Sequence, residues 1–435
     1  MKKIIFLLLF CLGLFASYKV YEYYADNGLY ANYVVEQYWQ GKGSVIDDGY
    51  TESVSYDFGD TIKVYVNASE TTTTYVRLFD INGSVVDSVK SYITSQQSQD
   101  NGSELGFGYT TSFEYVVPEL KGGIYLWENK IPFLVKGKRS KVGVLYSSNT
   151  TNAYNITGGK SFYSIFSEQS HQVSFQRPVF PAVSFQLRAG LEYFFNYPDE
   201  HFCYLSDMDL DDDHALEGLK LLVIIGHSEY WTRKARENFD KFVDEGGNAL
   251  ILSGNTMWWQ VRYDKSRTRL ICYKNETDPE NDPKLKTIEW SQEMLDYPVH
   301  ESIGLSFEYG GFGRKHGVGY DGLKIWAPSH PAFAGTGLSA GDVLSIPTKE
   351  YDGVCISESG MMVPRNPNIQ LLAYDSLSVT TNGAFIQYQK SDSSGIIINT
   401  GTMDWCSDYG LGGEDSVVLR KITDNMMRVL LEKSN

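Results

Sequence analysis

The spacing of apolar residues changes near residue 137 and divides the chain into two parts. In the first part, apolar and polar residues alternate, as they do around Ile62 and Val64. A period of two is typical of a β-strand with one buried face. The pair Asn82-Gly83 predicts a hairpin turn, and other turn residues recur nearby. Residues 43–137 are therefore predicted to form an antiparallel β-sandwich of immunoglobulin type.

In the second part, residues 138–435, continuous apolar runs alternate with helical patterns. The run at 221–225 holds only Leu, Val and Ile and indicates a strand that is buried on both faces. Thr232 then caps a predicted helix, and 248–253 resumes as a second strand. This alternation predicts a doubly wound, parallel α/β sheet, with a mostly irregular insertion at about 265–385.

Polar and aromatic residues follow the first of these buried strands, in Gly226-His-Ser-Glu-Tyr-Trp231. The carboxyl ends of parallel strands are where such sheets bind ligands. The segment begins like the G-x-S-x-G turn that carries a nucleophilic serine, but Tyr230 stands at the position of the last glycine. A side chain is crowded in that turn, so Ser228 is disfavoured as a nucleophile.

The same segment resembles the large (beta) subunit of N,N-dimethylformamidase and its relatives. Two further segments carry the resemblance, Gly254-Asn-Thr-Met-Trp-Trp-Gln-Val-Arg262 and Ile271-Cys-Tyr-Lys274. Shorter matching segments lie at 158–163, 173–178, 334–338, 350–352 and 401–405. The resemblance covers most of the chain from about residue 140 onward. It implies that 138–435 has a fold akin to class I glutamine amidotransferases.

The resemblance also implies a mononuclear iron, ferric in its resting state, that is bound by two tyrosines and one glutamate. Carried over by motif, these ligands are Tyr230, Tyr273 and Glu350, with Tyr351 and Asp352 as neighbouring alternatives. Phenolate and carboxylate are hard donors that suit a hard cation. A bound trivalent ion would remove the phenol proton and lower the pKa of a bound water.

His227, Glu229 and Asp404 are the candidate catalytic residues. His227 is open to three interpretations, as a proton carrier, a support for the metal ligands or a structural residue, and Asp404 is either an acid/base or a loop cap. The expected function is hydrolysis of a C–N amide bond by water activated on the iron. Two alternatives stay open: a non-enzymatic module that binds carbohydrate or peptide across the junction of sandwich and sheet, and a sugar-active hydrolase that uses Glu229 and Asp404.

The N-terminus predicts export. Met1-Lys-Lys precedes an apolar stretch at 4–16, which is shorter than the about 20 residues that span a bilayer. Residues 1–16 are therefore interpreted as a signal peptide or an N-terminal membrane anchor of a secreted or extracytoplasmic protein. Four of the five cysteines lie beyond this segment, and disulfides and buried free thiols are both consistent with their spacing.

Charge and aromatic residues bear on the partners. The net charge of −16 argues against nucleic acid as a partner. A small-molecule amide is the expected substrate, and a small partner subunit or a homo-oligomer is compatible with the resemblance. Trp258-Trp259 and Trp231 form either an aromatic platform for an amide or sugar substrate or part of the core.

Overall fold

The computed structural model describes residues 44–164, 167–198, 202–312, 322–346, 350–357, 363–376, 381–413 and 415–432. All of them except Ser44 belong to one compact unit, Val45–Asn435. The predicted signal peptide or anchor at 1–16 lies outside the described residues. Among the helices that are described, none is both long and apolar enough to cross a membrane.

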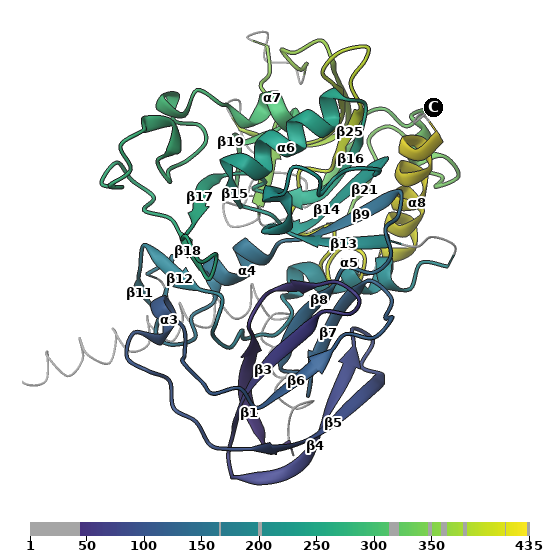
Figure 1. The fold of residues 1–435 in the computed structure, drawn as a ribbon. Helices are drawn as coiled ribbons and strands as arrows, with labels where there is room; N and C mark the ends of the chain where they lie inside the picture. Colours follow the sequence, from purple (N-terminus) through teal and green to yellow (C-terminus); the bar gives the residue numbers. More distant parts are fainter. Residues whose placement is uncertain are drawn as a thin grey trace, which may run out of the picture. The chain divides into compact units, whose positions relative to one another are not determined.

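The N-terminal part contains two β-sheets that share one hydrophobic core. Strands β1 (Ile46–Thr51), β3 (Thr61–Ala68) and β6 (Phe113–Val116) form the first sheet, and β2 (Ser55–Tyr56), β8 (Ile131–Val135), β7 (Gly123–Trp127), β4 (Thr72–Asp80) and β5 (Val85–Ile93) form the second (Figure 1). The predicted alternation is present, because Ile62 and Val64 are buried between more exposed neighbours. Their core also includes Leu78 and Trp127 of the second sheet.

The C-terminal part is built on a nine-stranded mixed sheet. Its parallel half has the order β13 (Phe202–Ser206), β9 (Val142–Tyr146), β14 (Leu221–His227), β16 (Asn248–Gly254) and β25 (Ile396–Asn399). The antiparallel half continues with β24 (Asn382–Gln389), β23 (Ile369–Ser376), β20 (Leu323–Ile325) and β21 (Val343–Leu344). The α/β class is therefore confirmed, but the prediction of a wholly parallel sheet is wrong, because β24, β23, β20 and β21 pair antiparallel. The finer likenesses to immunoglobulin and amidotransferase folds stay predictions.

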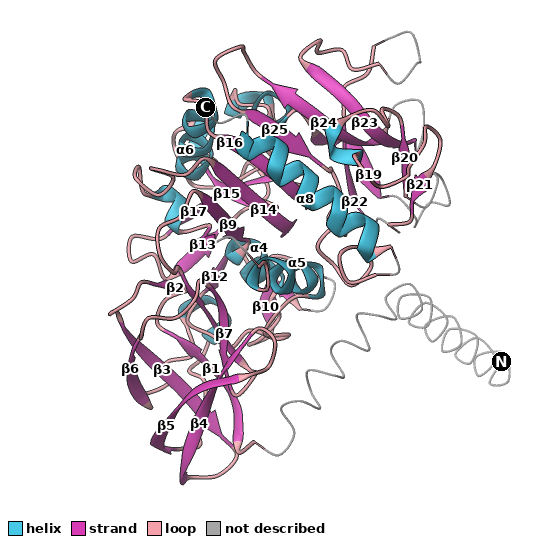
Figure 2. Cartoon of the chain, turned by 90° about the vertical axis from the view of Figure 1, so that its right-hand side faces the viewer, coloured by secondary structure: helices cyan, strands magenta, loops and turns pink. Residues whose placement is uncertain are grey.

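Helices cover both faces of this sheet. Val223 and Ile225 of β14 pack in one core with α5 (Phe185–Phe195) and α8 (Ser416–Glu432), which Figure 2 shows over the face turned to the viewer. Leu222 and Ile224 pack in a second core with α6 (Arg233–Asp244). The predicted cap is confirmed, because the Thr232 side chain accepts a hydrogen bond from the α6 backbone.

Strands also occur in the stretch of about 265–385 that was predicted to be mostly irregular. Four of the main-sheet strands begin within it, because short apolar runs such as 371–373 are buried in the core. Smaller elements surround the sheet: α3 (Gly102–Leu105), α4 (Ser148–Tyr154), α7 (Val299–Ile303), β10 (Lys160–Ser161), β11 (Glu168–Gln169), β12 (Gln172–Ser174), β15 (Tyr230–Thr232), β17 (Trp259–Tyr263), β18 (Arg269–Ile271), β19 (Ser306–Phe312) and β22 (Glu350–Gly353).

Cysteines within the described residues are free thiols. Cys203, Cys272 and Cys406 are buried, and Cys355 is partly exposed. The interpretation as small buried apolar residues therefore holds for three of the four.

Candidate functional site

The candidate site lies at the carboxyl ends of the parallel strands, with His227 as the last residue of β14. Gly226, directly before it, has a φ of +76°. A Cβ atom there would lie 2.4 Å from the Leu187 side chain, so both the backbone and the packing require glycine. This turn ends the buried strand and leads into 228–230, which lie beside α4 and β17.

Three phenols and one carboxylate meet here, and we call Tyr154, Tyr163, Glu229 and Tyr230 the phenol cluster. The Tyr154 hydroxyl lies 2.8 Å from Oε2 of Glu229 and 2.9 Å from the Tyr163 hydroxyl. The Tyr163 hydroxyl is 3.0 and 3.1 Å from the two Glu229 oxygens. Tyr230 donates to the Tyr163 hydroxyl at 2.6 Å. The first three residues thus form a triangle of oxygen atoms with similar edges.

Separate chain segments hold these phenols in place. Tyr154 is the last residue of α4, and Thr150 of the same helix accepts a hydrogen bond from the Glu229 backbone at 2.9 Å. Asn149 of α4 donates to the Tyr230 carbonyl at 3.1 Å. Tyr154 is 43% exposed, whereas the Glu229 side chain is 3% exposed. The cluster therefore opens to solvent on its Tyr154 side.

His227 links the phenol cluster to a second group, Glu350 and Asp352, which we call the carboxyl pair. Its Nε2 lies 3.2 Å from Glu229 and 3.9 Å from Glu350. Its Nδ1 donates to the Gly254 carbonyl at 3.0 Å, which can only accept. Burial lowers the pKa of His227, but the Glu350 and Glu229 charges outweigh burial and raise it to about 9.

The two glutamates have opposite pKa shifts. Burial raises the pKa of Glu229, but the hydrogen bond and charge of His227 outweigh burial and hold it below its ordinary value. Burial raises the pKa of Glu350, and His227 only partly opposes this rise. Burial also raises the pKa of Asp352 to about 7. Glu229 therefore stays charged near neutral pH, whereas the pKa of Asp352 lies near neutral pH and that of Glu350 is shifted upward.

The loop after β16 contacts both members of the carboxyl pair. Asn255 Nδ2 donates to Glu350 Oε2 at 3.0 Å, and the Thr256 backbone donates to Asp352 at 3.2 Å. Asn255 and Met257 both have positive φ, of 48° and 58°. Such backbone strain in non-glycine residues collects at functional sites. Within the described residues, the buried Oδ1 atoms of Asn255 and Asp352 have no hydrogen-bond partner.

A partly buried lysine lies against the phenol cluster. Lys274 Nζ lies 3.5 Å from the ring centroid of Tyr163, 4.8 Å from Trp259 and 5.3 Å from Tyr230. Trp259 also donates to Glu229 at 2.9 Å. Burial lowers the pKa of Lys274, and the Glu229 charge opposes this shift. Lys274 is therefore a cation held against aromatic faces beside the buried carboxylate.

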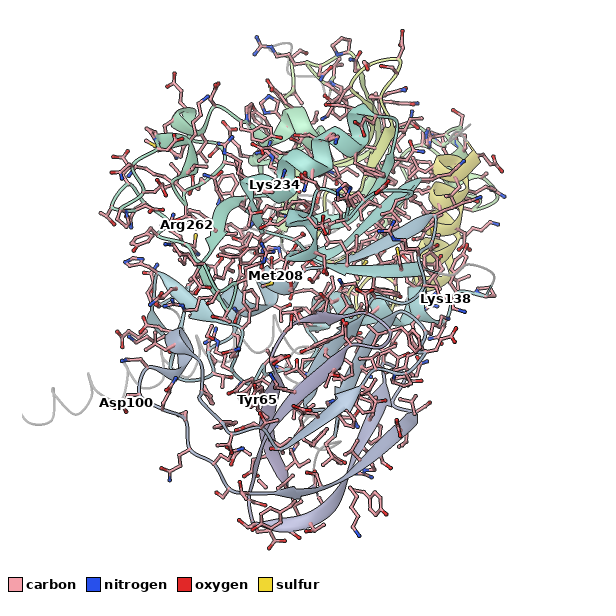
Figure 3. All side chains as sticks on the ribbon, viewed as in Figure 1. Tyr65, Asp100, Lys138, Met208, Lys234 and Arg262 are labelled. Carbon is pink, nitrogen blue, oxygen red and sulfur yellow. The ribbon has the colours of Figure 1, made fainter. Side chains whose placement is uncertain are left out.

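The structure brings together most of the predicted site residues. His227, Glu229, Tyr230 and Glu350 lie in the two groups just described, and Asp404 is close enough to raise the pKa of Glu350. Tyr273 makes its ring contact elsewhere: it stacks on His171 with centroids 4.5 Å apart. Arg262, labelled in Figure 3, has its guanidinium 5.7 Å from the Tyr273 ring.

Tyr154, Tyr163, Asn255 and Lys274 were not among the site residues predicted from the sequence. Three of them lie in or beside segments that carried the resemblance, at 158–163, 254–262 and 271–274. Lys274 was missed because Tyr273, directly before it, was taken as the site residue. Lys274 has a positive φ of 61°, and the two side chains point in different directions.

The donor atoms of the phenol cluster suit a hard cation in kind. No group of three or more His, Cys, Asp or Glu side chains in the described ranges has a metal-binding arrangement. Tyrosine is not among those four residue types. The triangle of Tyr154, Tyr163 and Glu229 has the expected composition of two tyrosines and one glutamate. The fit is therefore to this triangle. In the described residues, no hydrogen bond or ring contact joins Tyr230, Tyr273 and Glu350, the trio first predicted.

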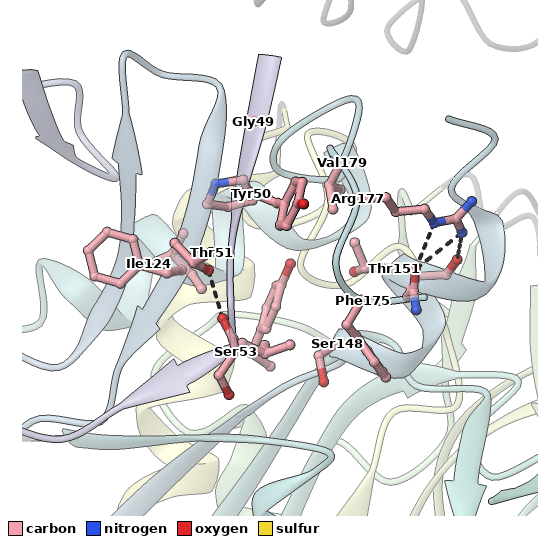
Figure 4. Close-up of a pocket in the computed structure, with 15 residues that line it drawn as sticks. Gly49, Tyr50, Thr51, Ser53, Ile124, Ser148, Thr151, Phe175, Arg177 and Val179 are labelled. Atoms are coloured by element: carbon pink, nitrogen blue, oxygen red, sulfur yellow. Dashed lines mark hydrogen bonds between the residues drawn. The ribbon is translucent and has the colours of Figure 1, made fainter. Parts of the chain in front are cut away.

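Two cavities lie where the N-terminal sheets meet the C-terminal part. The smaller, of about 50 Å³, is lined by Tyr50, Phe175 and Arg177 among others (Figure 4). Its size suits a few water molecules at most. The larger, of about 500 Å³, has a more polar lining that includes Lys136 and Asp209.

Comparison with known protein families agrees with the resemblance seen in the sequence. A sequence model of the family described as N,N-dimethylformamidase beta subunit-like, C-terminal, matches residues 88–415. The chain belongs to this family. The match crosses the predicted boundary at 137/138, and that boundary stays a prediction. No curated protein matches the sequence.

Solved structures give only distant matches. A ThuA-like protein from Bacteroides uniformis ATCC 8492 has a TM-score of 0.33 at 12% identity, covering 67% of this chain and 91% of that chain. A β-galactosidase from Rahnella sp. R3 has a TM-score of 0.35 at 10% identity, covering 67% of this chain and 31% of that one. The chain thus spans less than a third of the β-galactosidase.

Proposed function

We propose that this member of the N,N-dimethylformamidase beta subunit-like family hydrolyses C–N amide bonds. The observation that carries the proposal is the contrast across His227: a charged Glu229 among phenols on one side, and a Glu350 with a raised pKa on the other. Two carboxyls whose pKa values are pushed apart are the usual basis for dividing charge stabilisation from proton transfer. The expected substrate is a small-molecule amide.

A ferric iron is proposed at Tyr154, Tyr163 and Glu229, in place of the trio first predicted. Oxygen ligands at about 2.0–2.1 Å in an octahedral shell stand about 2.8–3.0 Å apart. The edges of the triangle through Oε2 of Glu229, 2.8, 2.9 and 3.1 Å, lie close to that spacing. When bound, iron supplies Lewis-acid polarisation of the substrate carbonyl and acidifies a water molecule. Tyr230 supports the triangle by donating to Tyr163.

The residues of the chain then divide the proton transfers. Glu350 takes a proton from the attacking water and returns it to the amine nitrogen as the C–N bond breaks, so the products are a carboxylic acid and an amine. Asn255 fixes Oε2 of Glu350 through its 3.0 Å hydrogen bond, which leaves Oε1 for the transfer. His227, with its raised pKa, stays protonated and holds both glutamates in place.

A direct assay tests the activity. The purified protein, reconstituted with ferrous iron in air, is given N,N-dimethylformamide and N-methylformamide, and released amine and formate are measured. Equal release of both products, lost in Glu350→Gln and kept in Tyr273→Phe, is the expected result. No release from either amide or from a wider amide panel, with iron bound, contradicts the proposal.

The larger junction cavity favours one alternative, a module that binds a polar ligand such as a sugar or peptide. This alternative predicts ligand binding that survives Glu229→Gln and does not need iron. The sugar-active hydrolase that uses Glu229 and Asp404 is less well supported. Glu229 accepts hydrogen bonds from Tyr154 and Trp259 and has a lowered pKa, which makes it a poor acid.

Export and subunit composition are proposed on the sequence alone. We propose that 4–16 directs the chain out of the cytoplasm and is either removed or kept as an anchor. Mass measurement of the N-terminal peptide from the native host separates these two outcomes, and an intact N-terminus in the cytoplasmic fraction contradicts both. The family description as a beta subunit supports a search for a small partner by native mass measurement.

A further inference from the structure

Four aromatic residues lie in a row beside the candidate site, and we call Trp259, Trp258, Phe307 and Phe312 the aromatic rim. The ring centroids of Trp259 and Trp258 are 6.3 Å apart, those of Trp258 and Phe307 are 5.4 Å apart, and those of Phe307 and Phe312 are 5.4 Å apart. All three pairs are edge-to-face, which is a favourable arrangement.

Both ends of the rim reach the site. At one end, Trp259 Nε1 donates to Glu229 Oε1 at 2.9 Å. At the other end, Phe312 of β19 stands directly opposite Glu350 of β22 in the antiparallel pair. Directly opposed residues in such a pair have their side chains on the same face. Phe312 therefore lies on the Glu350 side of the sheet.

The local backbone of β19 is irregular where it presents these rings. The register between β19 and β22 shifts between Ser306 and Gly311, so extra residues stand on the β19 side. Bulges of this kind occur next to active sites and change where a side chain points. Phe312 is 47% exposed, and Trp259, Trp258 and Phe307 are only partly buried.

We propose that the aromatic rim binds a flat, apolar substituent of the substrate, so that the preferred amides carry an aromatic ring near the scissile bond. This inference rests on the proposed amide hydrolysis for its reactive group, but the rim itself is a binding site. Large, partly exposed aromatic side chains gathered at one place mark a ligand surface. A planar ring can add to the edge-to-face row, and the small amide group then lies between Glu229 and Glu350.

Measurements of ligand binding test the aromatic rim independently of amide hydrolysis. N-benzylformamide and N-methylformamide share the reactive group and differ in the ring, and their dissociation constants are compared by calorimetry on the iron-loaded Glu350→Gln protein. Half-burial of an aromatic ring predicts roughly 10-fold tighter binding of the benzyl compound. Phe312→Ala and Phe307→Ala are each expected to reduce this ratio about 2- to 10-fold. Tyr92→Ala, which removes a 63% exposed ring on β5, is the control and keeps the ratio.

The results distinguish an error in the proposed role of the aromatic rim from an error in the proposed amide hydrolysis. The proposed role of the aromatic rim is wrong if the two amides bind equally. It is also wrong if neither phenylalanine variant changes the ratio of their dissociation constants. Tighter binding of N-acetylglucosamine than of N-benzylformamide overturns the choice of an aromatic substituent. If the benzyl preference and its loss are both seen but no amide is hydrolysed by the wild-type protein, the rim stands and the proposed activity falls.

Discussion

The phenol cluster and the carboxyl pair lie on either side of His227 and shift the pKa of a buried glutamate in opposite directions. Glu229 is 3% exposed and accepts hydrogen bonds from Tyr154, Tyr163 and Trp259. Glu350 is more exposed, at 16%, and accepts a hydrogen bond from Asn255. Burial alone would predict the reverse order of the pKa values.

The difference shows that the distance to the His227 cation matters more than depth. His227 Nε2 lies 3.2 Å from Glu229 and 3.9 Å from Glu350, and it holds the pKa of Glu229 down but only partly opposes the rise at Glu350. The phenol cluster is thus built to hold negative charge, which is what a cation site needs. The carboxyl pair, with raised pKa values, is suited to exchange a proton, which is what an acid/base needs.

The largest expected effect tests the charged side. Glu229→Gln removes the carboxylate from the triangle and leaves Tyr154 and Tyr163 without their shared acceptor charge. We expect iron binding to be lost together with activity, both by more than about 100-fold, because loss of even a supporting group near a metal ligand lowers affinity 10–100-fold. Iron per chain by elemental analysis and amide hydrolysis measure the two effects. Full iron content in this variant would contradict the ligand assignment.

The next effect tests the proton-holding side. Glu350→Gln keeps the hydrogen bond to Asn255 and removes the titrating group. We expect kcat to fall by about 10²–10⁴-fold with iron content unchanged, because this is the usual contribution of a general acid/base. The proposed division of roles between the two glutamates is wrong if Glu350→Gln loses iron as readily as Glu229→Gln, since both glutamates would then be ligands.

A smaller effect separates the proposed ligands from the first prediction. Tyr163→Phe is expected to lower iron affinity about 10- to 100-fold and to weaken the visible phenolate-to-iron absorption. Tyr273→Phe is the matched change, because it removes a hydroxyl from a ring that stacks on His171. Its spectrum and iron affinity should equal those of the wild type. The reverse outcome would restore Tyr273 as the ligand and remove Tyr163.

Sequence patterns predicted where the candidate site lies more reliably than which residues belong to it. The buried run of β14 and the polar residues after it follow from local periodicity, so His227, Glu229 and Tyr230 were identified without a structure. Tyr154, at the end of α4, and Tyr163, in the loop after it, reach the site from far earlier in the chain, and no local pattern marks such a contact. Tyr273 and Lys274 are neighbours, but the Lys274 side chain lies against Tyr163 whereas the Tyr273 ring stacks on His171.

The last effect concerns another buried carboxyl, Asp207, which has hydrogen-bond donors but no ion pair with a cation among the described residues. It accepts from the Asn149 backbone at 2.7 Å and from Ser148 at 3.3 Å, yet burial outweighs both and raises its pKa to about 7. In the unfolded chain the pKa returns to its ordinary value, so between about pH 4 and 7 the folded state binds the extra proton. Stability from this group is therefore full at low pH and falls as the pH rises through about 7. Asp207→Asn keeps an acceptor and removes the titration, so its stability relative to the wild type should rise between pH 5 and pH 8, by at most about 3 kcal/mol for the two pH units between pH 5 and the folded pKa of about 7. Urea unfolding at the two pH values measures this difference, with the exposed Asp100→Asn as control. Parallel pH dependence in wild type and Asp207→Asn would mean that two hydrogen-bond donors suffice to keep a buried carboxylate charged, and that His227 adds little at Glu229.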